Sequence, residues 1–193
     1  MQVSHPNLGS PHAMVTPWAE LVVVGSRSID ELTNSTTTID HTHHEIHEGD
    51  SYHISNQQNI ANAGSFNYLI VTPNTTTFTH LFINLVSQAE AQETFFEGVA
   101  VTDSGTALSS YNRKRASTNA AGVKVFLTPT LVSSGAILQI RNWGTGKNIG
   151  DIMRSENEWI LNSGTTYMIN AKNNTTSDNL TTTWLNWYEH IET

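Results

Sequence analysis

The chain has 193 residues, enough for one compact domain with its own hydrophobic core. Only 13% of them are charged, whereas Thr, Asn and Ser, at 26, 19 and 18 residues, make up about a third, a composition that favours strands and turns and excludes a helical bundle. The net charge of −8 disfavours nucleic acid and anionic membranes as partners, and the absence of cysteine excludes disulfides and thiolate sites.

The N-terminal residues 1–17 are predicted to form an extended arm outside the packed body. They contain Pro6, Gly9, Pro11 and Pro17 and show neither helical nor strand periodicity. We expect this arm to lie against a neighbouring subunit or back on its own domain. The region lacks the basic start and apolar run of a secretory leader, and no segment of the chain reaches the roughly 18 apolar residues of a membrane span.

Residues 18–193 are predicted to form a single all-β domain, with one helical turn at residues 28–31. Strands are expected at residues 20–24, 37–47, 52–55, 68–72, 78–87, 94–102, 106–111, 123–128, 136–142, 158–161, 165–172 and 181–190. Turn signals recur between them without helical patterns, so βαβ units and a parallel sheet are not supported. The expected fold class is an antiparallel β-sandwich of the jelly-roll type with an extended N-terminal arm, because a jelly roll protects its edges at this strand number.

A histidine-rich segment, HTHHEIHE at residues 41–48, is the sharpest local feature of the sequence. On the strand predicted there, His41, His43, Glu45 and His47 would point to one face, with neighbours about 6.5 to 7 Å apart. Imidazole and carboxylate groups are ligands for Zn, Fe, Mn or Ni. The segment is expected to turn at residues 48–51 into the next strand, as a hairpin does.

Two interpretations of this segment stay open. The first is a metal site, since His41, His43 and Glu48, with His80 and Asn84 further along, partly match the metal motifs of cupins, although no Pro-x-Gly precedes His80. The second is a solvated strand whose histidines bond to their neighbours or form an interface. The second is preferred, so no metal ligand and no cofactor is predicted. The histidines could also sense pH between 5 and 8.

No catalytic machinery is recognised in the sequence. The Gly-x-Ser-x-Gly motif, the Walker loop and the glycine pattern of dinucleotide-binding proteins are all absent. Glu90, Glu93 and Glu97 could supply a carboxylate pair for glycoside chemistry, but acidic residues on a loop and a strand edge are more simply solvated. We therefore predict no catalytic residue and expect a protein that is not an enzyme.

Two other clusters could contact a partner. Residues 113–115, Arg-Lys-Arg, lie in a predicted loop and either solubilise it or meet an acidic surface of a partner or neighbouring subunit. The side chains of the C-terminal run alternate between two faces, with Trp184, Asn186 and Tyr188 on one and Leu185, Trp187 and Glu189 on the other. Aromatic residues on both faces indicate a strand covered on both sides, either as a central strand or with a second subunit on one face.

An ordered series of short motifs covers residues 40–191. It consists of HEIHEGDSY at 44–52, IVTPNT at 70–75 with His80, EGV at 97–99, GT at 105–106, NRKR at 112–115, EWIL at 158–161, TTY at 165–167 and NWYEH at 186–190. This series resembles a group of structural proteins encoded by tailed bacteriophages. Residues 1–36 lie outside the match, which leaves the manner of docking open.

The resemblance implies a virion component without an active site, of the jelly-roll cement or decoration type. We expect a homotrimer, made in the host cytoplasm, that binds the major capsid protein on the outer surface of the head and stabilises the shell by bridging capsid subunits. Nucleic acid and membrane are not expected as partners. The alternatives are a tail or fibre component that contacts the host surface, and a cupin-like metal-dependent enzyme that uses His41, His43, Glu48 and His80.

Overall fold

The computed structural model describes residues 13–15, 21–23, 41–143, 149–150 and 158–191. The chain divides into two compact units, residues 1–41 and 42–193. In the first unit, strand β1 (Ala13–Val15) pairs with β2 (Leu21–Val23) in antiparallel fashion, which confirms a strand at residues 20–24. The rest of the arm predicted at residues 1–17 and the helical turn at residues 28–31 lie outside the described residues, and the domain boundary at residue 18 stays a prediction.

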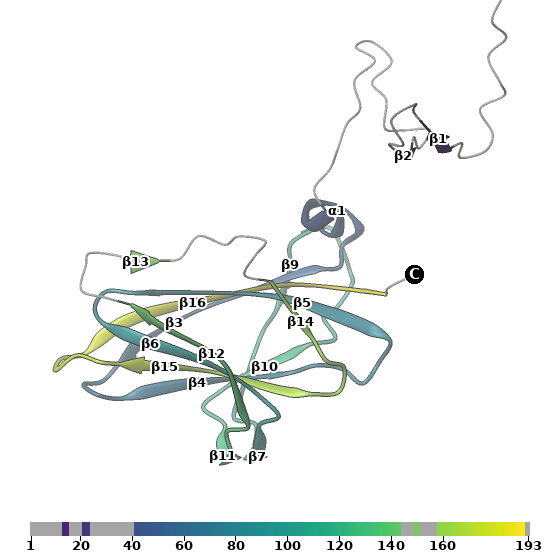
Figure 1. Cartoon of the computed structure of the whole chain (residues 1–193). Helices are drawn as coiled ribbons and strands as arrows, with labels where there is room; N and C mark the ends of the chain where they lie inside the picture. Colours follow the sequence, from purple (N-terminus) through teal and green to yellow (C-terminus); the bar gives the residue numbers. More distant parts are fainter. Residues whose placement is uncertain (1–12, 16–20, 24–40, 144–148, 151–157, 192–193) are drawn as a thin grey trace, which may run out of the picture. The chain divides into compact units, whose positions relative to one another are not determined.

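The second unit contains two large antiparallel sheets that pack face to face (Figure 1). The first sheet has, in order, β12 (Ala136–Trp143), β6 (Ala91–Glu97), β15 (Thr166–Asn173), β4 (Ser65–Val71), β10 (Lys124–Leu127) and β8 (Thr106–Leu108). The second has β13 (Ile149–Gly150) and β14 (Glu158–Leu161) beside β5 (Thr77–Ser87), then β16 (Asn179–Ile191), β3 (Ser51–Ile60) and β9 (Tyr111–Asn112). A separate pair, β7 (Ala100–Asp103) and β11 (Thr130–Ser133), lies at one end of the sandwich.

The strand pairing confirms the predicted jelly roll. Eight strands pair from the two ends of the domain inward. The first strand, β3, pairs with the last, β16; β4 then pairs with β15, β5 with β14, and β6 with β12. Such a long hairpin, rolled up, gives the two four-stranded layers β3-β16-β5-β14 and β4-β15-β6-β12. The remaining short strands extend these layers at their edges.

The core lies between the two layers. Its largest fully buried side chains are aromatic or aliphatic and include Trp187, Tyr68, Tyr167 and Phe95. One face of β5 points into the core, since Leu81, Ile83 and Leu85 belong to hydrophobic clusters of buried residues. The opposite face of β5 is buried as well, because His80, Phe82 and Asn84 are each less than a tenth exposed.

The strand predicted at residues 37–47 and the hairpin after it are wrong. His41–Glu48 is a helix, α1, and residues 37–40 lie outside the described residues. Gly49 ends the helix with a φ of 90°, and the amides of Gly49 and Asp50 both donate to the Glu45 carbonyl (3.2 and 3.0 Å). Glycine adopts this left-handed conformation at little cost, so the Gly-Asp pair marks a helix C-terminus and not a hairpin corner.

Two further predicted strands are interrupted. The segment at residues 94–102 divides at Gly98, whose φ of 73° separates β6 from β7, and the segment at 106–111 divides into β8 and β9. Strand β11, which follows Pro129, was not predicted. In the part of the chain that is described, α1 is the one helix, and at eight residues it is too short to cross a bilayer.

Candidate functional site

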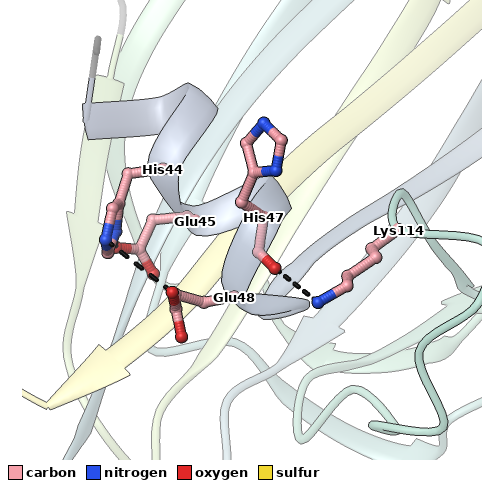
Figure 2. Close-up of polar contacts among 5 residues, drawn as sticks. All are labelled: His44, Glu45, His47, Glu48 and Lys114. Carbon is pink, nitrogen blue, oxygen red and sulfur yellow. Dashed lines mark hydrogen bonds and ion pairs between the residues drawn. The ribbon is translucent and has the colours of Figure 1, made fainter. Parts of the chain in front are cut away.

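The histidine-rich helix and the basic loop, which the sequence presents 67 residues apart, meet in the structure. The Nζ of Lys114 donates to the main-chain carbonyl of His47 at 2.6 Å (Figure 2). Asn112 Nδ2 donates to the carbonyl of Gly49 at 2.6 Å. The last carbonyls of a helix have no hydrogen-bond donor within the helix, so the loop supplies donors to main-chain carbonyls at the end of α1.

The loop itself is held in one shape by its own polar side chains. Asn112 Oδ1 accepts from the amide of Lys114 (2.9 Å), and the Lys114 carbonyl accepts from the amide of Ser117 (2.8 Å). Asn119 Nδ2 reaches the Asp50 carboxylate at 3.0 Å. Because Asn112 lies in β9 and pairs with Tyr52 of β3, Lys114 is positioned by the sheet.

The histidines of α1 form two neighbouring rows on the helix. His43 and His47, four residues apart, place their Nε2 atoms 2.8 Å from each other, and both are exposed. On the other row, His44 approaches Glu45 with Nδ1 (3.4 Å) and Glu48 with Nε2 (3.8 Å). Figure 2 shows the His44 ring beside both carboxylates, while His47 projects away from them. A helix brings residues four apart together, whereas residues two apart point in different directions.

Charges of both signs surround this helix. The loop contributes Arg113, Lys114 and Arg115, and Arg115 lies over the ring of Tyr111 at 5.6 Å. The acidic side chains described in α1 and directly after it are Glu45, Glu48 and Asp50, equal in number to the three basic side chains of the loop. That these histidines sense pH remains a prediction.

The described residues do not form the cupin-like metal set. No three histidine, aspartate or glutamate side chains of the described residues are arranged to hold a metal ion. The reason is the helix at residues 41–48, since the predicted common face of His41, His43 and Glu45 requires a strand. The side chain of His41 is not among those that the structure describes. His53 belongs to β3 and bonds through Nδ1 to Asn186 Oδ1 at 2.9 Å.

His80 belongs to a second cluster, on the outer face of the β3-β16-β5-β14 layer. Its Nδ1 lies 2.6 Å from Glu158 Oε1, and the hydroxyl of Tyr188 donates to the same oxygen at 2.5 Å. The ring of His80 stacks on Tyr188 (centroids 4.4 Å apart), and His190 lies 4.6 Å from it. A carboxylate only accepts hydrogen bonds, so Glu158 orients both side chains. No local pattern along the chain predicted this cluster, because its members come from three separate strands.

The three glutamates considered for glycoside chemistry have separate structural roles. Glu93 is buried and lies 3.6 Å from Arg141 Nε, while the Glu97 carboxylate accepts from Tyr167 (2.9 Å) and Asn162 (2.8 Å). The main-chain carbonyl of Glu90 accepts a hydrogen bond from the amide of Asn174. The backbones of Glu93 and Glu97 lie about 13 Å apart along β6, and the two carboxylates have different partners. The prediction that these acids are solvated is wrong for Glu93.

The C-terminal run is a central strand, β16, between β3 and β5. Leu185 and Trp187 face the core and are buried, whereas Trp184 on the other face is partly exposed. Glu189 accepts bonds from Trp187 Nε1 (2.8 Å) and from the amides of residues 122 and 123 (2.9 and 3.1 Å). Burial, with added repulsion from Glu189 and Asp50, raises the pKa of Tyr52 to about 12.

The outer face of the first sheet has a continuous apolar row. Six apolar residues lie side by side across this sheet, each paired with the next on the neighbouring strand. In order, they are Ile137, Phe96, Met168, Leu69, Phe126 and Ala107, and we call them the apolar row. Cross-strand partners point to the same side of a sheet. Val99 and Val101 pack on its middle, whereas Ile137 at its β12 end is 58% exposed. Successive residues of a strand point to opposite faces, so consecutive apolar residues such as Leu69 and Ile70 in β4 indicate that both faces of this sheet are covered.

No protein-family model matches this sequence, and no curated protein matches it either.

Proposed function

We propose that this protein is a structural component of a tailed-bacteriophage virion, a decoration protein that binds the outer surface of the head. It assembles as a homotrimer and bridges neighbouring copies of the major capsid protein, which stabilises the shell. The motif series at residues 40–191 and the jelly-roll sandwich support this assignment. The mechanism is binding alone, because burial of surface at many symmetric contacts adds up without any new chemistry.

The observation that carries this proposal is the apolar row. A monomeric sandwich normally presents polar side chains on the outer faces of its sheets. Here the outer face carries six apolar residues in succession: Leu69 and Met168 in the middle are buried within the chain, and Ile137 at the β12 end is exposed. Ile140, which is 51% exposed, lies on the same edge strand. Exposed apolar side chains on an edge strand are suited to a protein contact.

A second copy of this chain is the occupant we assign to the β12 end of the row. Two copies of a chain with a net charge of −8 repel each other, and an uncharged contact avoids opposing like charges. The apolar row contains no charged residue. A specific contact needs about 800 Å² from each partner, more than one isoleucine provides, so we expect neighbouring parts of β12 and β11 to join it.

The trimer is tested by changing one exposed isoleucine on each sheet. Ile137 and Ile160 are equally exposed at 58%, but Ile160 lies on β14 in the other sheet. Sedimentation should show a trimer for the parent and for Ile160→Asp, and a monomer for Ile137→Asp. A monomeric parent, or equal behaviour of the two variants, contradicts the assigned contact.

The role on the head is tested with particles of the phage that encodes this chain. Heads made without the protein should lose integrity at lower temperature than complete heads, and added purified protein should restore the difference. Unchanged heat resistance would remove the stabilising role. Gold-labelled antibody should mark the head, and label on the tail would instead favour a tail or fibre component.

A further inference from the structure

We propose that His43 and His47 form a two-histidine binding site for a divalent transition-metal ion, Cu²⁺ or Ni²⁺, on the exposed side of α1. The site is independent of the proposed virion role, because it requires only the helix and its two imidazoles. Both rings are exposed, and their Nε2 atoms lie 2.8 Å apart. Neutral imidazole is a ligand that both ions accept readily.

The separation of the two nitrogen atoms can be compared with the spacing of ligands around an ion. Metal–nitrogen bonds are about 2.0–2.1 Å long, so two nitrogens in adjacent positions of a square-planar or octahedral ion lie about 2.9 Å apart. Tetrahedral ligands would lie about 3.3 Å apart. The observed 2.8 Å is a hydrogen-bond distance between the two rings, and it is close to the spacing of the right-angled arrangement, which Cu²⁺ and Ni²⁺ favour. The ring centroids are 4.7 Å apart, so small rotations of exposed rings direct both nitrogens to one ion.

The helix is held in place before any ion binds, which lowers the conformational cost of chelation. Gly49 and Asp50 close its last turn on the Glu45 carbonyl, and Lys114 bonds to the carbonyl of His47. The ammonium of Lys114 contacts the main chain, while the His47 ring projects away from it (Figure 2). The positive charge of Lys114 is thus directed at the carbonyl and not at the two imidazoles.

Among the described side chains, the neighbours of this pair supply no third ligand of the same kind. His44 lies on the adjacent row and approaches Glu45 and Glu48. No set of three histidine or acidic side chains in the described part of the chain is placed to coordinate an ion. Water therefore completes the coordination, and we expect binding weaker than at a closed structural site.

The test measures Ni²⁺ binding to the full chain, without an affinity tag, by titration calorimetry near pH 7.5. One equivalent should bind, and His43→Ala or His47→Ala should weaken the binding at least tenfold. His44→Ala is the matched control, since this residue is also exposed and lies on the same helix; it should change the affinity less than threefold. The double variant His5→Ala/His12→Ala removes two other imidazoles and should likewise leave this binding in place.

A second measurement identifies the ligands directly and does not depend on the affinity. The electron paramagnetic resonance spectrum of one equivalent of Cu²⁺ should show coupling to two imidazole nitrogens in the parent and to fewer in His43→Ala and His47→Ala. Both substituted residues are exposed, so these variants should unfold at the temperature of the parent. Equal Ni²⁺ binding by the parent and both variants, or loss of binding in His44→Ala or in the His5/His12 variant, would overturn the proposal.

Discussion

Lys114 Nζ donates a 2.6 Å hydrogen bond to the main-chain carbonyl oxygen of His47. The bond joins a loop to the last turn of α1 across 67 residues and places a cation at the end of the helix where the dipole is negative. Two features that are separate in the sequence, the histidine-rich segment and the basic trio, thereby become one surface. The position of the histidines depends on this contact as well as on the helix itself.

Replacing Lys114 should therefore loosen α1. Lys114→Met removes the bond and the favourable charge, and we expect the free energy of unfolding to fall by about 0.5–1 kcal/mol. Hydrogen exchange of the amides in α1 should become faster. Arg113→Met removes the same formal charge one residue earlier and serves as the control. Equal effects of the two substitutions would show that net charge, and not the bond to His47, matters.

Gly49 should tolerate substitution poorly, for two reasons. Its φ is 90°, and a Cβ placed there would lie 2.7 Å from the Oγ of Ser117. Gly98 has a similar φ of 73° with no heavy atom within 4 Å of such a Cβ. Chemical denaturation should show a loss of about 1 kcal/mol for Gly98→Ala and about 2–3 kcal/mol for Gly49→Ala. Equal losses would mean that Ser117 moves aside freely.

Glu189 should contribute strongly to stability, because its carboxylate accepts three hydrogen bonds. The donors are the indole of Trp187 and the amides of Gly122 and Val123. Glu189→Ala leaves these donors without an acceptor, and we expect the free energy of unfolding to fall by about 2–4 kcal/mol. Glu48→Ala is the control, since that side chain is 61% exposed, and should cost less than about 0.5 kcal/mol. A comparable loss in both variants would contradict this prediction.

Tyr52 should make the fold sensitive to alkali. Its pKa is raised from 10.0 to about 12, so between these pH values the folded chain keeps a proton that the unfolded chain releases. The contribution is complete below pH 10 and is lost as the pH rises through 12, with a slope of about 1.4 kcal/mol per pH unit.

Urea unfolding at several pH values should show this slope reduced in Tyr52→Phe. Tyr111→Phe is the control, because Tyr111 is 56% exposed, and its slope should match that of the parent. Parallel pH profiles for the parent and Tyr52→Phe would show that Tyr52 does not hold its proton more tightly in the folded chain.

The prediction of the strands succeeded where one face or both faces of a strand are apolar. The inward face of β5, with Leu81 and Ile83, and the two-faced burial of β16 were both readable from alternation along the chain. The segment at residues 41–48 failed because its side chains are almost all polar, so no hydrophobic period could distinguish a helix from a strand. The left-handed Gly49 was the available signal, and it fits a helix end as well as a hairpin.

The sequence by itself determined an all-β sandwich, because abundant Thr, Asn and Ser and frequent turns leave few other ways to bury an apolar core. Only the tertiary structure decided which polar residues meet. His80 contacts Glu158 and Tyr188, and Lys114 contacts His47, because strands far apart in the chain pair with each other. Local spacing carries no information about such contacts, because the register between strands is set by packing of the whole sheet. The same register creates the apolar row, whose six members are scattered from Leu69 to Met168 along the chain.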